Sequence, residues 1–313
     1  MALKLYIGLA SFVLSFLAIF LNLLIFIPVF RLGFIAKKST IYVIAFFNIL
    51  SDLMQLSITC FYLTASIVAD RYVITGARTS SLSIIFGWIF INAWYMECLV
   101  QIVMAVNRFT VISLQKRHIF TFKTTLAIFV VLISTTAFSA ICTQYVFPCC
   151  VFICDKDVMS FMFINIEGLY SYSNLMLVSY DVFCTSTSTL CYISVFRSIR
   201  KSYKTAPSNV QKKRANDDVK YLTQFVFISI FFIFTWVLFE LLPYIVPKDQ
   251  PEWFSVVPVL VTLNCSSNSI IYLSMNKHVQ QSLQIPWLRN KLGGPKSSSN
   301  VNVIQVLPLS SPS

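Results

Sequence analysis

Seven long apolar segments follow one another along the chain, separated by short polar stretches. Each is long enough for a helix that crosses a bilayer, which needs about 20 mostly apolar residues. The apolar residues run continuously instead of alternating in short strands, so helices are favoured over a β-barrel. The pattern therefore predicts seven membrane-spanning helices, at about Leu5–Phe30, Ile41–Val68, Leu82–Leu114, Thr124–Phe147, Leu169–Phe196, Tyr221–Val246 and Phe254–Met275.

The composition places the chain in a bilayer. Hydrophobic residues make up 57% of it, charged residues only 12%, and the mean hydropathy is +0.75. A soluble domain carries roughly 25% charged residues. The first segment is too long for a cleavable signal peptide and lacks a small-residue cleavage site, so we take it as a true first span. The expected fold class is an all-α membrane protein, a seven-helix bundle.

The positive charge predicts how the bundle is oriented. The formal net charge is +12, but its distribution favours membrane topology over binding of nucleic acid. Lys and Arg accumulate in cytoplasmic loops. With the N-terminus outside, the outer segments hold five of the 24 Lys and Arg residues: Lys4, Arg71, Arg78, Lys156 and Lys248. We therefore expect the N-terminus outside, the C-terminus inside and the lipid bilayer as surroundings.

The segments outside the spans suggest one domain and a tail. Residues 1–283 are expected to form the bundle, with a short amphipathic helix at about 276–284 on the inner membrane surface. The stretch "GGPKSSSN" predicts a disordered cytoplasmic tail over 285–313. Residues 148–168 form the longest outer loop.

The cysteines and histidines do not form a metal-binding pattern. Nine cysteines are scattered without a CxxC pair, and the chain has two histidines. No cofactor is expected, and no metal beyond the sodium ion considered below. The sequence does not choose a disulfide pairing among the outer cysteines Cys60, Cys142, Cys149, Cys150 and Cys154.

Four acids lie inside the predicted spans, where burying a charge costs several kcal/mol and usually marks function. They are Asp52, Glu97, Asp181 and Glu240. In the third span, helical spacing puts one face of the helix into the bundle. This face carries Phe90, Trp94, Glu97, Gln101, Met104 and Arg108. Phe90 and Trp94 are therefore candidates for a ligand pocket, or they simply pack between helices.

A polar cluster is expected near the middle of the membrane. Two carboxylates, Asp52 and Glu97, cannot both stay ionised in one dry site without a cation. With Asn264 and Asn268 they form either a site for a cation such as sodium or a purely structural hydrogen-bond network between helices.

The sixth span offers a second candidate for the ligand pocket. Glu240 lies one turn beyond Trp236 in the outer half of the span, and Pro243 permits a kink nearby. The alternative is that neighbouring tyrosines satisfy Glu240. The role of Asp181 in the fifth span stays open.

These residues resemble the rhodopsin-like G-protein-coupled receptors. "NRF" at 107–109 ends the third span, where that family carries Asp-Arg-Tyr. "NCSSNSIIY" at 264–272 is similar to the family's Asn-Ser-x-x-Asn-Pro-x-x-Tyr pattern, with Ser269 in place of the proline. Asn22 and Asp52 match the polar residues of spans one and two. The resemblance covers about residues 10–283.

The details resemble the nematode serpentine chemoreceptors of class X. The segments concerned are "NRF", "IFTFKTT", "PCCVFICD" and "IIYLSMNKHV". The chain also departs from the rhodopsin-like pattern. Gln115 replaces a common proline, and span four has no tryptophan. Residues 79–84 contain no cysteine, so the usual disulfide from span three to the second outer loop cannot form.

The resemblance implies a chemosensory receptor that is not an enzyme. It implies a small-molecule ligand of odorant or pheromone type, a heterotrimeric G protein as partner, and the plasma membrane, in sensory cilia, as location. Its ligand-binding residues would be Phe90, Trp94, Trp236 and Glu240. Its activation network would be Asn22, Asp52, Glu97, Asn264, Asn268 and Tyr272. Coupling to the G protein would use Asn107, Arg108 and Phe109, with the basic segments 108–123 and 201–220 around them. A secondary transporter or a ligand-gated channel is the alternative.

Overall fold

A computed structural model describes residues 2–116, 118–164, 166, 168–205, 209–247 and 249–283, apart from the side chains of residues 2, 202–225, 275 and 277. The predicted tail over 285–313 lies outside these residues. In the basic segment 201–220, the side chains from residue 202 onward also lie outside the described part of the structure.

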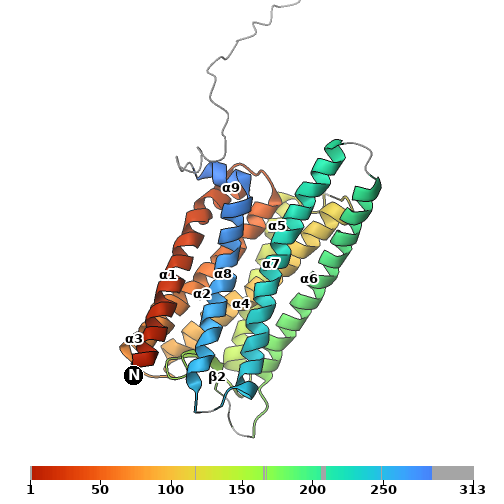
Figure 1. The fold of residues 1–313 in the computed structure, drawn as a ribbon. Coiled ribbons are helices and arrows are strands. Elements are labelled where there is room, and N and C mark those ends of the chain that lie inside the picture. Colours follow the sequence, from red (N-terminus) through yellow and green to blue (C-terminus); the bar gives the residue numbers. More distant parts are fainter. Residues whose placement is uncertain are drawn as a thin grey trace, which may run out of the picture.

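The described part of the chain forms a bundle of seven long helices, which confirms the expected fold class (Figure 1). The long helices are α1 (Ala2–Phe30), α2 (Thr40–Ile58), α4 (Ser81–Arg108), α5 (Phe122–Ile141), α6 (Tyr172–Thr205), α7 (Asn209–Ile245) and α8 (Val256–Met275). A short helix, α9 (Lys277–Ser282), follows α8 within the stretch predicted to be amphipathic.

Four of the long helices continue in a π-helical turn. These turns are η1 (Arg31–Ile35), η2 (Thr59–Thr64), η3 (Phe109–Ser113) and η4 (Cys142–Val146), and α3 (Ala65–Ala69) extends η2. A 3₁₀ turn, η5 (Pro251–Ser255), leads into α8. Side chains cap several helices. The Ser80 hydroxyl accepts the Ser83 amide at 3.2 Å at the start of α4, and Thr121 does the same for Thr124 at α5.

Six of the described helical segments are long and apolar enough to cross a membrane. Helix α6 is not among them, because residues 184–190, "CTSTSTL", place five consecutive serines and threonines at its centre. Polar residues are tolerated in a spanning helix when they face other helices. Accordingly Asp181 and Ser188 of α6 are buried inside the bundle.

Helix α4 occupies the centre of the bundle, where it contacts α2, α5 and α6. It is the most buried of the six segments, with 72% of its apolar window inside the protein. Tyr95, Glu97 and Cys98 of α4 are fully covered. Residues on α4 can therefore contact several other helices at once.

The loop over residues 148–168, predicted to be the second outer loop, contains a β-hairpin instead of irregular chain. Strand β1 (Phe152–Asp155) pairs antiparallel with β2 (Ser160–Phe163), and Phe152 lies opposite Phe163. The hairpin lies at the end of the bundle that also holds the N-terminus, and α9 lies at the opposite end (Figure 1). These strands are not predicted from the sequence, because their pairing depends on the helix ends beneath them.

Candidate functional site

Glu97 is held between two helices in the middle of the bundle. The Gln55 side-chain amide of α2 donates to Oε2 of Glu97 at 2.8 Å. The Asn264 amide of α8 donates to the other oxygen, Oε1, at 2.6 Å. All three side chains are buried, so these bonds are strongly favoured over leaving the groups unpaired. The carboxylate therefore joins α2, α4 and α8.

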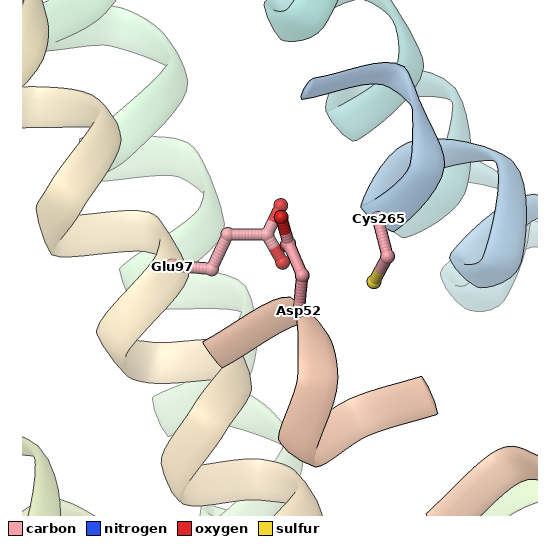
Figure 2. A group of neighbouring side chains, drawn as sticks. All are labelled: Asp52, Glu97 and Cys265. Carbon is pink, nitrogen blue, oxygen red and sulfur yellow. The ribbon is translucent and has the colours of Figure 1, made fainter. Parts of the chain in front are cut away.

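Asp52 lies beside Glu97 and is bonded in the same way. The amides of Asn48 and Asn268 both donate to Oδ2 of Asp52, at 3.1 and 3.0 Å. Figure 2 shows the Asp52 and Glu97 carboxylates pointing toward each other, with the Cys265 thiol nearby. One ligand atom from each of these three residues lies within 4.8 Å of the others. The four cluster residues expected from the sequence are thus brought together.

The cluster retains buried oxygen atoms that receive no hydrogen bond from the described residues. They are Asp52 Oδ1, Gln55 Oε1, Asn264 Oδ1 and Asn268 Oδ1. Carboxylate and amide oxygens are the ligands that hard cations prefer. The donor set therefore fits a small cation, while the amide bonds also link the helices as a structural network would. Both expectations for this cluster are compatible with the geometry.

The remaining residues of the expected activation network join α1 to α8. The Asn22 side-chain amide donates to the Ala18 carbonyl at 3.0 Å and to the Cys265 carbonyl at 3.1 Å. Tyr272 is buried nearer the α9 end of α8, in an apolar cluster with Ile25 and Val29 of α1.

The motif "NRF" marks the end of α4. Asn107 is buried, Arg108 is half-buried as the last residue of the helix, and Phe109 begins the π-helical turn η3. Phe109 packs against the cluster that contains Tyr192 and Val195 of α6. The motif therefore lies at the α4–α6 contact, at the end of α4 away from the hairpin.

A second site lies between the central cluster and the hairpin. It is a small, mostly apolar pocket, with a cavity volume of about 20 Å³. Three of the four predicted ligand-binding residues line it: Phe90, Trp94 and Trp236. Glu240 is not among the lining residues. Its Oε2 instead accepts the Asn174 amide at 3.1 Å.

Asp181 lines this pocket, and sequence reasoning had left its role open. Its Oδ1 accepts the Trp94 indole N–H at 3.0 Å and the Cys98 thiol at 3.5 Å. An acid inside a span was a signal of function, but only packing shows that this one faces the pocket. Trp236 is also oriented by a bond, from its indole N–H to the Thr185 hydroxyl at 3.2 Å.

The hairpin forms one wall of the pocket. The Phe161 ring stacks on Phe90 with centroids 4.0 Å apart, and Phe152 lies 5.7 Å from the same ring. Phe239 of α7 also lines the pocket and lies near Phe152, at 6.3 Å between centroids. Aromatic residues from the loop and the helices therefore make one continuous surface.

Two hydrogen bonds attach the hairpin to Gln144 of η4, and a close contact joins it to α4. The Gln144 side chain accepts the Phe152 amide at 2.8 Å and donates to the Phe152 carbonyl at 2.9 Å. Gly87 lies directly beneath, and a Cβ at this position would overlap the Phe152 carbonyl oxygen. This close approach supplies the contact between α4 and the second outer loop that a disulfide cannot provide here.

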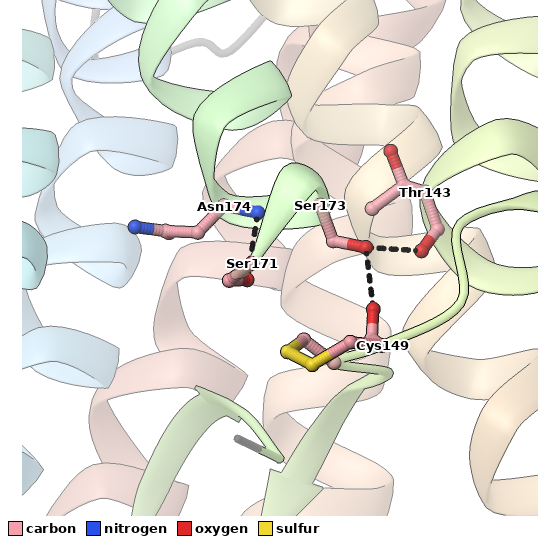
Figure 3. Close-up of a disulfide and its surroundings, with 6 residues drawn as sticks. Thr143, Cys149, Ser171, Ser173 and Asn174 are labelled. Atoms are coloured by element: carbon pink, nitrogen blue, oxygen red, sulfur yellow. Dashed lines mark hydrogen bonds between the residues drawn. A yellow bond between two sulfur atoms is a disulfide. The ribbon is translucent and has the colours of Figure 1, made fainter. Parts of the chain in front are cut away.

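The outer cysteines form a disulfide between the adjacent residues Cys149 and Cys150 (Figure 3). Cys60, Cys142 and Cys154 have free thiols. The Ser173 hydroxyl donates to the carbonyls of Thr143 and Cys149, at 2.8 and 3.2 Å, and so ties the disulfide to the start of α6.

Ion pairs fix the outer tip of the hairpin. Lys4 of α1 contacts Asp70 at 2.7 Å, and Lys156 bridges Asp70 and Asp157 at 3.2 and 2.7 Å. The hydrogen bond from Lys4 holds the pKa of Asp70 below its usual range, and Lys156 does the same for the pKa of Asp157. Buried Asp155 pairs with Arg78 and accepts the Tyr72 hydroxyl at 2.9 Å.

Comparison with solved structures shows the fold of the protein. Squid rhodopsin superposes with a TM-score of 0.70 at 14% sequence identity, covering 93% of this chain and 87% of the rhodopsin chain. The bundle therefore has the fold of a rhodopsin-like seven-helix receptor, and at this identity the likeness concerns the fold alone.

A family model gives the more specific assignment. The model of the serpentine-type 7TM GPCR chemoreceptors Srx matches residues 12–276, and the chain belongs to this family. No curated protein sequence matches it. The resemblance inferred from the motifs is confirmed: this is a multi-pass membrane protein and a chemoreceptor of the G-protein-coupled class, not an enzyme.

Proposed function

We propose that this receptor binds a small molecule of odorant or pheromone type in the outer pocket and activates a heterotrimeric G protein at the opposite end of the bundle. The observation that carries the proposal is the arrangement of α4. Phe90 and Trp94 line the pocket, Glu97 anchors the central cluster and Arg108 ends the helix. One central helix thus connects all three places.

Binding in the pocket can change the coupling end only through a difference in affinity between two arrangements of the bundle. Trp94 and Trp236 belong to α4 and α7, so a ligand between them contacts two helices that can move apart. The distribution of Lys and Arg supports an outer N-terminus, which puts the hairpin and the pocket on the extracellular side. We place the receptor in the plasma membrane of sensory cilia, as its family suggests.

We further propose that the central cluster binds sodium, with Asp52, Glu97 and the amide oxygens of Asn264 and Asn268 as ligands. Support comes from the buried oxygens that receive no hydrogen bond from the described residues. A bound cation would balance the charge of the carboxylates in a region of low dielectric. It would hold α2, α4 and α8 in one arrangement and so influence activation.

The decisive experiment is a ligand screen on cells that express the full chain with a promiscuous G protein. A ligand should stimulate nucleotide exchange, and Arg108→Ala should reduce that response at least about tenfold, on the scale of allosteric coupling energies. Surface expression and ligand affinity should be unchanged, because Arg108 lies far along α4 from the pocket. Ligand-evoked current or substrate uptake without nucleotide exchange would instead support the channel or transporter.

A further inference from the structure

We propose that the outer pocket is built for a small organic cation, an amine or quaternary ammonium compound, with Asp181 as its counter-ion. This inference rests on the proposed function, since it names the class of ligand for the same pocket. It depends on three features of the pocket: its acid, its aromatic walls and the charge around it.

Asp181 is the one ionisable residue among the twelve that line the pocket. Both of its hydrogen bonds, from the Trp94 indole and the Cys98 thiol, end on Oδ1. Within the described part of the chain, its Oδ2 has no hydrogen-bond donor, and no Lys, Arg or His forms an ion pair with it. A buried carboxylate needs a cation or several donors to stay charged. The structure supplies two neutral donors to Oδ1 of Asp181, and a bound ammonium group would place a positive charge beside Oδ2.

Aromatic rings make up half of the pocket lining, six residues of twelve. Two of them are tryptophans whose indole N–H groups are already engaged, Trp94 with Asp181 and Trp236 with Thr185. These bonds fix the ring orientations, and Trp94 also stacks on Phe232 at 5.3 Å. The faces of tryptophan attract ammonium groups more strongly than those of other side chains. An acid beside fixed indoles is a suitable lining for an organic cation.

The charge around the pocket points the same way. Within the described residues, no Lys, Arg or His forms an ion pair with Asp181 or with the nearby acids Glu240 and Glu97. At the hairpin tip, Arg78 is paired with Asp155, and Lys156 is paired with Asp70 and Asp157. An anionic ligand would therefore meet repulsion, and a neutral one would leave Asp181 without a partner. The cavity is small, about 20 Å³, so even a ligand with few heavy atoms must displace some of the side chains that line it.

The test uses the full-length receptor in lipid nanodiscs, without G protein, and two pairs of probes matched in shape. The pairs are choline with 3,3-dimethylbutan-1-ol, and 2-phenylethylamine with 2-phenylethanol. Binding is followed by intrinsic tryptophan fluorescence, because Trp94 and Trp236 line the pocket. We expect at least one ammonium probe to bind ten or more times tighter than its neutral partner. Equal affinity within both pairs, or no binding of either ammonium probe, would overturn the proposal.

Two variants assign the effect to Asp181. Asp181→Asn keeps the size and the acceptor for Trp94, and should weaken the ammonium probe at least tenfold while leaving the alcohol unchanged. Glu252→Gln makes the same chemical change in η5, away from the pocket lining, and should alter neither. Unchanged ammonium affinity in Asp181→Asn would also overturn the proposal. If the Asp181→Asn variant fails to fold, the proposal is tested by whether the unaltered receptor prefers the ammonium probes to their neutral partners.

The outcome is separable from that of the proposed function. Binding of the ammonium probe without ligand-stimulated nucleotide exchange in cells would refute G-protein activation and leave the ligand class standing. Nucleotide exchange driven only by neutral or anionic compounds would refute the ligand class and leave the receptor function standing.

Discussion

Glu97 and Asp181 are both carboxylates buried inside the same bundle, yet their surroundings differ. Each oxygen of Glu97 accepts an amide, from Gln55 on one side and Asn264 on the other. Asp181 accepts two neutral donors on one oxygen and borders a pocket with the other side of its carboxylate. Both acids link helices, but only Asp181 lines the pocket and has an oxygen that receives no hydrogen bond from the described residues. Burial of an acid alone does not distinguish a structural role from a binding role; the number and position of its donors do.

The largest expected effect comes from removing each of the two acids in turn. Glu97→Leu strands two buried amide donors and should lower stability by about 3 kcal/mol, since an unpaired buried donor costs roughly 1–3 kcal/mol. Asp181→Leu strands one indole N–H and one weakly donating thiol, and should cost about 1 kcal/mol. Thermal unfolding of the purified receptor in nanodiscs measures both. Equal losses in the two variants would mean that the two acids play the same structural part.

A second test disturbs the outer pocket alone. Gly87→Val places a branched side chain against the Phe152 carbonyl and should push the hairpin outward, at a cost of roughly 1–3 kcal/mol for overpacking. Ligand affinity should fall about tenfold, since 1.4 kcal/mol corresponds to a factor of ten. Gln144→Ala, which removes the clamp without overlap, should weaken binding in the same direction. Unaltered affinity in both variants would show that the hairpin does not shape the pocket.

A third test addresses the central cluster alone. Replacing potassium by sodium at constant ionic strength should change ligand affinity about fivefold, within the usual range of coupling between sites. Asp52→Asn should abolish this dependence. Asp181→Asn should bind the ligand more weakly yet keep the dependence on sodium. An unaltered receptor that responds equally to both ions would leave the cluster as a hydrogen-bond network only.

The smallest expected effect concerns pH at the hairpin tip. The pKa values of Asp70 and Asp157 are lowered by their lysine partners, so their stabilising contribution is complete at neutral pH and is lost as pH falls through these lowered values. The contacts should weaken only below about pH 4, near the ordinary aspartate pKa. Hydrogen exchange of the hairpin amides should then increase, and Asp70→Asn should show part of this increase already at neutral pH. Amides of α4 around Glu97 serve as the internal control.

The helices were predictable from sequence because they depend on local regularities, and the central cluster was predictable because acids and amides buried in a membrane need one another as partners. Apolar run length gives the helices, and helical periodicity put Phe90, Trp94 and Glu97 on one face of α4. The same spacing does not bring Glu240 into the lining of the pocket. Glu240 follows Trp236 by four residues, which rotates its side chain about 40° around the helix axis in one direction. Phe239 follows Trp236 by three residues and is rotated in the other direction, toward the pocket that both Trp236 and Phe239 line.

What could not be predicted depends on contacts between distant segments. The hairpin combines β1 and β2 with Gln144 of η4 and Gly87 of α4, and no local pattern links these residues. The pairing of Cys149 with its neighbour was one of several alternatives until the loop geometry was known. The orientation of Asp181 follows from how α6 is rotated against α4, which hydropathy does not determine because α6 is rich in serine and threonine.

The clamp between Gln144 and Phe152 has a consequence for the timing of the response. Because the hairpin is held in place, a ligand can leave the pocket no faster than the hairpin, or the helices beside it, can open. A receptor with slow exchange averages a fluctuating stimulus over the residence time of each molecule and does not follow brief pulses. The two hydrogen bonds on Phe152 therefore influence how long the response outlasts a stimulus, as well as which molecule the receptor binds.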